Sequence, residues 1–294
     1  MNSSIENTCP GPKKSWNRAL LQGLPIFMWM LLLILVPLAI MFVTSFFVKE
    51  GVQVVHRLTL RNYLEFFTNP IYLPIFFRTI FLALSVSLTA LLLAYPLAFF
   101  ISRKVTRFRS QLYMMVIVPL WISYLVRIVA WRTILGRVGV LNSLLLALGL
   151  IREPLPFLIY SPFAVYLTLI HIALPFVFIS VFSSLEKIPS NLLDATSDLG
   201  ANSFQTFRHV ILPLSMPGVV SGFTLAFVIA LGDYIIPQQL GGLNGLMFGN
   251  LIVSQFGYAF NWPLGAALGF IMFAVAVAIL FFSQKLGSSE GFLE

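Results

Sequence analysis

The sequence is poor in charged residues and almost free of cysteine. Of its 294 residues, only 10% are charged and one is a cysteine, Cys9. A single cysteine excludes a disulfide within the chain and a metal site built from several thiolates. Soluble domains carry about 25% charged residues, whereas 59% of this chain is hydrophobic. A soluble fold of this length could not bury so much apolar surface.

Motifs that would indicate an enzyme are also missing. No segment matches G-x-x-x-x-G-K-[ST], so the sequence lacks the phosphate-binding loop of many ATPases. Its three histidines are scattered, and no H-E-x-x-H motif is present. The basic residues give a net charge of +8 but flank apolar runs, unlike a nucleic-acid-binding patch. We therefore expect no catalytic residues, no metal site, no cofactor bound by this chain and no nucleic acid partner.

Long apolar runs are what the sequence has in abundance. Several of them reach the ~18–20 residues that a helix needs to cross the hydrocarbon layer. They lack the two-residue alternation of a membrane barrel, and a helix satisfies its own backbone hydrogen bonds in lipid. The runs predict an all-α integral membrane protein with six transmembrane helices, at residues 20–47, 79–100, 111–131, 159–183, 214–236 and 263–284.

Basic residues indicate which ends of these helices face the cytoplasm. Lys13, Lys14 and Arg18 precede the first span, and four cations lie in RKVTRFR, residues 103–109, after the second. The positive-inside rule places both groups in the cytoplasm, and an even number of spans places the C-terminus there too. The prediction is a membrane domain at 20–285, a cytoplasmic loop at about 186–213 and cytoplasmic tails at 1–19 and 286–294.

Within the spans, small residues and prolines predict close packing and kinks. Small residues recur four apart, which lets helices approach closely in lipid; they are Ala90, Ala94 and Ala98, Gly218 and Gly222, and Gly265 and Gly269. Prolines inside or at the edges of spans predict kinks, at Pro37, Pro96, Pro119 and Pro175.

The predicted cytoplasmic loop contains a water-compatible helix pair, NLLDATSDLGANSFQTFRHVILPLSMPG, residues 191–218. Asn191 is expected to cap the first helix, with Asp194 as the acid of a capping box. Gly200 is expected to end it in a left-handed conformation, and a second helix is expected after Asn202 or Ser203. Both helices have an apolar face. Such faces suit either the headgroup layer or a docked partner.

This loop resembles the EAA loop of ABC-importer permeases. Asp194, Ala195 and Thr196 are followed by three residues, Gly200, nine residues and Val210-x-Leu212-Pro213. The family pattern has Glu-Ala-Ala at the first three positions, so Asp194 and Thr196 depart from it. The resemblance implies a type I ABC importer permease-like bundle with a cytoplasmic coupling helix. It also implies an ATPase-coupling set: Asp194, Ala195, Thr196, Gly200, Phe204, Phe207, Leu212 and Pro213.

Four other segments resemble the spermidine/putrescine branch of these permeases: PLWISYLVRIVAW, LGRVGVLNSLLLALGL, ALGDYIIPQQLGG and NWPLGAA. The resemblance implies a permease subunit for a small polar solute, a polyamine such as spermidine or putrescine. An amino-acid-like or opine-like solute is the alternative within the class. The family also implies two ATPase subunits that use ATP and magnesium, a second, non-identical permease chain and an extracytoplasmic solute-binding protein.

The expected location is the bacterial inner membrane, in contact with lipid. An alternative of another class is a secondary transporter driven by an ion gradient. Such a transporter also has broken helices and charges at the membrane midplane. It does not require a cytoplasmic EAA-like helix pair, and that feature separates the two classes.

One acidic residue, Asp233, lies well inside a predicted span, and charges in spans are candidates for function. Gly232, Tyr234 and Pro237 surround it and predict a broken helix that could receive an ammonium group. The alternative is an ion pair of Asp233 with Arg127 or Arg132. The candidate substrate pathway is Asp233, Tyr234, Tyr124, Trp121, Arg127 and Trp131, although interfacial aromatic belts also account for the aromatic residues. His171 is expected to be a packed, hydrogen-bonded histidine rather than a proton carrier.

Overall fold

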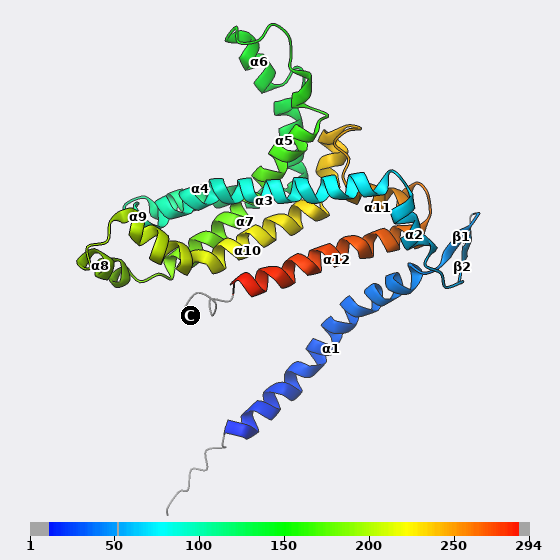
Figure 1. The fold of residues 1–294 in the computed structure, drawn as a ribbon, viewed down its shortest axis with the longest axis horizontal. Helices are drawn as coiled ribbons and strands as arrows, with labels where there is room; N and C mark the ends of the chain where they lie inside the picture. The colour runs from blue at the N-terminus through cyan, green and yellow to red at the C-terminus, as the bar shows by residue number, and fades with distance from the viewer. Residues whose placement is uncertain (1–11, 52, 288–294) are drawn as a thin grey trace, which may run out of the picture.

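The computed structural model describes residues 12–51 and 53–287. Its helices lie along one another in an elongated bundle (Figure 1). Six segments within the described residues are long and apolar enough to cross a membrane: Leu24–Thr44, Tyr72–Arg103, Tyr124–Ala147, Pro162–Glu186, Ser203–Gly232 and Trp262–Lys285. The predicted number of spans and the all-α class are confirmed.

Three helices form the centre of the bundle: α3 (Tyr72–Arg103), α7 (Pro162–Glu186) and α10 (Leu212–Gly232). They pack on one another along most of their length. Their shared interface is lined by small and aliphatic residues and by Phe178 and Phe227, both fully buried. Apolar packing of this kind, with small residues that admit close backbones, holds helices together in lipid.

The predicted small-residue rows lie at these interfaces. Ala90, Ala94 and Ala98 are fully buried on α3. A methyl group added at Gly218 of α10 would lie 2.4 Å from Cβ of Ser184 on α7. Gly218 thus permits the close approach of α7 and α10, as predicted.

Only the first residue of the second glycine pair, Gly265 and Gly269, behaves as predicted. Gly265 lies against the ring of Phe256, where an added Cβ would be 2.9 Å from a ring carbon. Around Gly269 an added Cβ would meet no described atom within 4 Å. A four-residue spacing of glycines is therefore not sufficient evidence for a helix contact at both positions.

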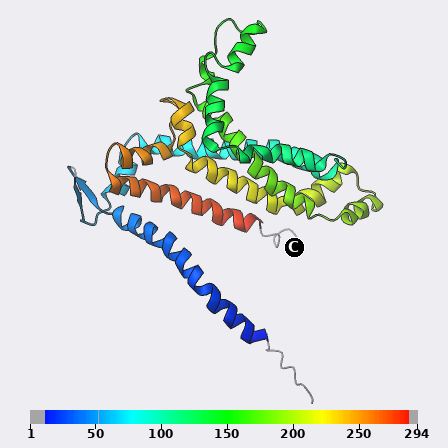
Figure 2. The ribbon, with the colours of Figure 1, turned by 180° about the vertical axis from the view of Figure 1, so that it is seen from behind.

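The two terminal spans lie outside this centre. Helix α12 (Trp262–Gly287) packs on α10, and α1 (Pro12–Thr44) packs on α12 near one end, where the rings of Phe42 and Phe270 are 5.2 Å apart. From that contact α1 diverges from the bundle (Figures 1 and 2). Most of its apolar side chains from Leu24 to Val43 are consequently exposed.

A hairpin and a short helix connect α1 to α3. The hairpin consists of β1 (Val48–Glu50) and β2 (Gln53–Val55), which pair antiparallel, and α2 (Arg61–Thr68) follows. The buried amide of Asn62 donates to the carbonyls of Ser45 and Phe47, both at 2.8 Å. These bonds satisfy the backbone where α1 ends, so the chain turns at residues 45–47 although the apolar run continues to there.

The third span differs from the prediction. Residues 111–131 do not form one helix, because α4 (Arg109–Ile117) passes through a 3₁₀ turn, η1 (Val118–Trp121), before α5 (Tyr124–Leu135) begins. Pro119 lacks the N–H that a continuous helix requires at its position. The helices continue through Pro37, Pro96 and Pro175, so among the four prolines the break is at Pro119.

Figure 1 shows α5 and α6 (Val140–Ala147) projecting from the side of the bundle. The chain returns through η2 (Pro156–Leu158) to α7. The final connection contains η4 (Pro237–Gly241) and α11 (Phe248–Gly257), which packs on α12 and α3. The connection between α5 and α7 thus contains a further helix, α6.

Candidate functional site

The loop predicted to be cytoplasmic lies at one end of the bundle, opposite the hairpin (Figure 1). It consists of α8 (Ser190–Asp198), α9 (Ser203–Thr206) and the π-turn η3 (Phe207–Ile211), which continues into α10. The helix pair predicted for this region is present. The predicted N-cap at Asn191 is wrong: α8 begins at Ser190 after Pro189, whose extended backbone ends the preceding turn, and Asp194 therefore does not close a capping box there.

Gly200 ends α8 as predicted. Its φ is +79°, in the left-handed region that disfavours residues with a Cβ. The amide of Ala201 donates to the carbonyl of Thr196 at 3.0 Å, and the Gly200 amide donates to Ser197 at 2.9 Å. These bonds satisfy carbonyls at the end of α8.

The second helix starts where the sequence predicted. Asn202 is its N-cap: its Oδ1 accepts from the amide of Gln205 at 2.9 Å, and Oε1 of Gln205 accepts from the Asn202 amide at 2.8 Å. This reciprocal pair is a capping box. The hydroxyls of Thr196 and Thr206 are 3.0 Å apart and join α8 to α9. Thr196, which departs from the family pattern, thereby connects the two helices.

Apolar residues of the loop face in two directions. Leu199 is 87% exposed and Phe204 is 67% exposed. Phe207 instead packs into the bundle against the rings of Tyr95 and Phe99, with centroids 6.0 and 5.9 Å away. Leu212 and Pro213 begin α10 and are partly buried. The outward face of the loop is therefore available to another molecule, while Phe207 anchors it to the bundle.

A second group of predicted residues lies where α10 ends. Asp233 has an extended backbone, and the helical chain is interrupted at Asp233 and Tyr234, as predicted. Oδ1 of Asp233 accepts from the amide of Ile236 at 2.9 Å, and Oδ2 accepts from the hydroxyl of Tyr124 on α5. The carboxylate thus caps the next helical turn and connects α10 to α5.

The predicted ion-pair alternative is not seen. Among the described side chains, neither Arg127 nor Arg132 lies within ion-pair distance of Asp233. The Arg127 guanidinium lies 5.9 Å from the ring centre of Tyr124, and its Nε and Nη1 are shielded without a hydrogen-bond partner in the described residues. Arg132 donates to Oε1 of Gln239 at 3.3 Å. Among the residues that the structure describes, no cation therefore forms an ion pair with the Asp233 carboxylate.

The predicted aromatic residues do not form one cluster. Trp131 packs on His171, with ring centroids 5.5 Å apart, so His171 is packed as predicted, but its ring has no hydrogen bond among the described residues. Trp121 lies in η1 before α5 and is 75% exposed. Tyr234 is bound through its carbonyl, which accepts from Nδ2 of Asn250 at 2.7 Å. Within the candidate pathway, the described side chains thus make two direct contacts, from Tyr124 to Asp233 and from Arg127 to the Tyr124 ring.

Sequence reasoning missed two residues that hold the chain near Asp233. Asn250 fixes the Tyr234 carbonyl, and Arg78 donates from Nη1 to the carbonyl of Asn244 at 2.8 Å and from Nη2 to that of Leu246. Both anchor the connection that follows the helix break. Arg78 lies one residue before the predicted second span, and its charge at that boundary was the available signal. A polar amide at residue 250 gave no comparable signal.

Comparisons with known proteins identify the family. Residues 90–287 match the model of the binding-protein-dependent transport system inner membrane component. The chain belongs to this family. The match includes the α8–α9 loop and the chain around Asp233, so both groups of residues lie within the part that defines these permeases.

Curated relatives agree with this assignment. The permease is 35% identical over 258 residues to the spermidine/putrescine transport system permease protein PotB of Haemophilus influenzae, covering 87% of this chain and 89% of the relative. It is 36% identical over 240 residues to PotB of Escherichia coli K12, covering 81% and 86%. It is also 35% identical to the inner membrane ABC transporter permease protein YdcU of the same organism, covering 81% and 79%.

Solved structures share the fold of the permease. A bacterial ABC transporter that imports the acidic polysaccharide alginate matches with a TM-score of 0.70 at 20% identity, covering 94% of this chain and 96% of that one. The MetNI methionine ABC transporter matches with a TM-score of 0.55 at 18% identity, covering 75% and 98%. The protein is thus a multi-pass inner membrane permease with the type I ABC importer fold.

Proposed function

We propose that this permease lines the translocation path of an ATP-driven importer for polyamines. The proposal depends on two features of the structure. A helix pair at one end of the bundle exposes apolar side chains away from the bundle, and the Asp233 carboxylate lies at the break after α10 without an ion-pair partner among the described residues. The helix pair provides a surface for an ATPase. The carboxylate provides a site for an ammonium group.

Chemistry supports a cationic solute at Asp233. A carboxylate inside a membrane protein is costly unless it has a partner of opposite charge or several donors. Asp233 has two donors, Tyr124 and the Ile236 amide. Its negative charge remains available to an arriving cation, and the adjacent Tyr124 ring adds cation–π attraction. The names of the PotB relatives support spermidine or putrescine as that cation.

The loop supports coupling to a separate ATPase. Leu199 and Phe204 expose apolar side chains on its outer face, and such side chains bury well in a groove of a partner. Two ATPase subunits would bind ATP and magnesium, so this chain itself would perform no hydrolysis. Asp194, Ala195 and the turn at Gly200 would lie at the contact.

The remaining partners follow from the transport cycle. A second, non-identical permease would complete the path, and an extracytoplasmic binding protein would deliver the solute at the hairpin end. Both termini would then be cytoplasmic. An amino-acid-like or opine-like solute is the second candidate, supported by the presence in the fold of transporters for other solutes, such as methionine.

The test is solute-dependent ATP hydrolysis by the complex that co-purifies with this permease, reconstituted with its binding protein. We expect spermidine or putrescine to stimulate hydrolysis, with no stimulation by amino acids or opines. Stimulation by amino acids or opines alone would overturn the polyamine assignment. Absence of any co-purifying ATPase would overturn the importer assignment.

A further inference from the structure

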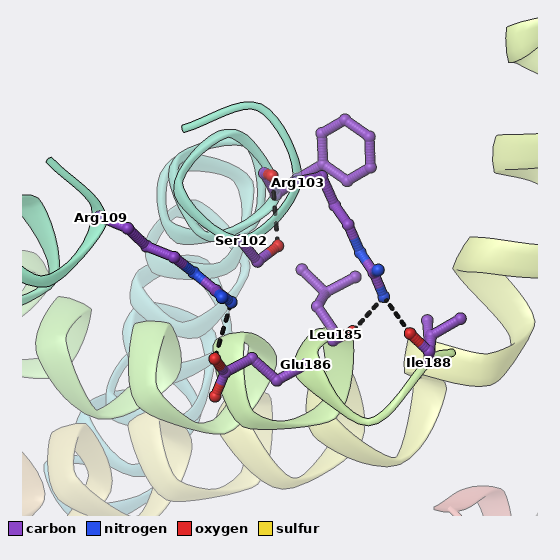
Figure 3. Close-up of polar contacts among 7 residues, drawn as sticks. Ser102, Arg103, Arg109, Leu185, Glu186 and Ile188 are labelled. Atoms are coloured by element: carbon purple, nitrogen blue, oxygen red, sulfur yellow. Dashed lines mark hydrogen bonds and ion pairs between the residues drawn. The ribbon is translucent and has the colours of Figure 1, made fainter. Parts of the chain in front are cut away.

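Two arginines attach the end of α7 to the neighbouring helices just before the cytoplasmic loop (Figure 3). Arg103 is the last residue of α3, and its Nη2 donates to the carbonyl of Leu185 and, at 2.9 Å, to that of Ile188. The last carbonyls of a helix lack donors within the helix. A cation is also favourable there because the C-terminal end of a helix has a partial negative charge.

The second arginine holds α4 to the same place. Arg109 is the first residue of α4, and its Nη2 lies 2.7 Å from Oε1 of Glu186, the last residue of α7. Its guanidinium also lies 5.3 Å from the ring centre of Phe182, on which Tyr113 packs at 4.8 Å. Exposed ion pairs contribute little to the stability of a fold. The pair's contribution is therefore geometric more than energetic.

The loop begins directly after this attachment. Ile188 is buried and is followed by Pro189, after which α8 begins at Ser190. Every residue of α8 is exposed or only partly buried, so α8 buries little surface against the bundle. The carbonyl of Ile188, held by Arg103, is the last point of the chain fixed to α3 before the loop.

We propose that Arg103 positions the cytoplasmic loop. Together with the Arg109–Glu186 pair, Arg103 makes α3, α4 and the end of α7 move with this loop. We call these three residues the arginine clamp. The inference rests on the proposed function and adds the route by which the ATPase and the solute path communicate. From α4 the chain runs through η1 to α5, where Tyr124 binds Asp233. A displacement of the loop would thereby reach the carboxylate through contiguous contacts.

The functional test compares two arginines of the same cytoplasmic turn in the assembled complex. Arg103→Gln removes the cation but keeps a long side chain. Arg107→Gln removes a cation from an exposed position over the ring of Phe108. We expect Arg103→Gln to preserve ATPase co-purification and basal hydrolysis but to lower spermidine-stimulated hydrolysis about tenfold, as loss of hydrogen bonds from a charged group would. Arg107→Gln should stay within about twofold of the parent. Equal behaviour of the two variants would overturn the proposal.

A charge exchange tests the Arg109–Glu186 pair of the clamp. It tests the proposal even if Arg103→Gln fails to insert. Arg109→Glu and Glu186→Arg should each lower stimulated hydrolysis, and the double variant should recover it to within about threefold of the parent. Absence of recovery in an inserted, assembled double variant would overturn the role of the pair.

A distance measurement tests positioning without reference to solute or ATPase activity. Spin labels at Lys104 and Ser197, in a Cys9→Ser background, report the loop relative to α3. The full complex should give a narrow distance distribution, retained by Arg107→Gln and broadened by Arg103→Gln. A narrow distribution in Arg103→Gln would overturn the clamp. Failure of the parent complex to hydrolyse ATP would contradict the proposed function while leaving this distance test valid.

Discussion

At the scale of single residues, Gly200 determines how the two helices of the loop meet. Its φ of +79° is favourable for glycine, and asparagine adopts it at a lower cost than other residues that have a Cβ. No described atom lies within 4 Å of a Cβ placed there. A substitution at Gly200 therefore acts through the backbone and not through a clash.

Gly200→Val should cost about 1–2 kcal/mol in the left-handed turn. The expected result is a disordered helix pair, with less ATPase bound per permease while membrane insertion is normal. Gly200→Asn is the matched control, because asparagine tolerates this conformation, and it should retain most of the binding. Co-purification of the ATPase from membranes measures the effect. Equal binding by Gly200→Val and the parent would contradict a role for this turn.

A substitution at Asp233 tests whether its carboxylate binds a cationic solute. Asp233→Asn keeps one oxygen to accept hydrogen bonds but removes the negative charge. We expect spermidine uptake to fall about tenfold or more, since hydrogen bonds to charged groups are the stronger ones, while assembly and basal ATP hydrolysis persist. Tyr124→Phe is the control: it removes the hydroxyl donor to Asp233 and keeps the carboxylate, so uptake should fall less. Normal uptake by Asp233→Asn would exclude the carboxylate as a solute site.

Residue-level features were predictable where backbone chemistry is local. The left-handed Gly200 and the helix start at Asn202 follow from preferences of single residues, and both predictions are confirmed. The cap at Asn191 was wrong because Ser190 already lies in the helix. The bonds from Tyr124 to Asp233 and from Arg103 to Ile188 join residues distant in sequence, and no local pattern contains that information.

At the scale of helices, Gly218 allows α7 and α10 to pack closely. A Cβ at Gly218 would lie 2.4 Å from the Ser184 side chain and 2.5 Å from the carbonyl oxygen of Ser180. The helix backbones would have to separate to accept it. Gly218→Ala should destabilise the permease by about 1–3 kcal/mol, the range for overpacking a close contact.

Gly269→Ala is the matched control for this packing, because a methyl there meets no described atom within 4 Å. The thermal unfolding midpoint of the purified permease should fall for Gly218→Ala and stay near that of the parent for Gly269→Ala. Similar midpoints for both variants would contradict the α7–α10 contact.

The helix-level prediction from sequence was correct for five spans and wrong for the third. Hydropathy locates apolar runs but does not distinguish a proline that a helix accommodates from one that ends it. Pro96 and Pro175 lie inside continuous helices, whereas α4 ends just before Pro119. What differs is the surroundings: α5 departs from the bundle at this point (Figure 1), and sequence does not state where a helix must turn.

At the scale of the whole molecule, the α8–α9 loop and the hairpin lie at opposite ends of the bundle (Figures 1 and 2). In a Cys9→Ser background, a cysteine at Ser203 should react with an impermeant thiol reagent only from the cytoplasmic side. A cysteine at Gln53, which is exposed on β2, should react from the opposite side. Inside-out and right-side-out vesicles measure this. The reverse pattern would invert the topology and remove the loop from reach of a cytoplasmic ATPase.

The most direct test of the account is spermidine uptake into proteoliposomes that contain the co-purified complex and its binding protein. We predict uptake that requires ATP on the side of the α8–α9 loop, requires the binding protein on the hairpin side, and persists when ion gradients are dissipated. Uptake that proceeds without ATP and stops when the ion gradients are dissipated would contradict the account and identify a secondary transporter.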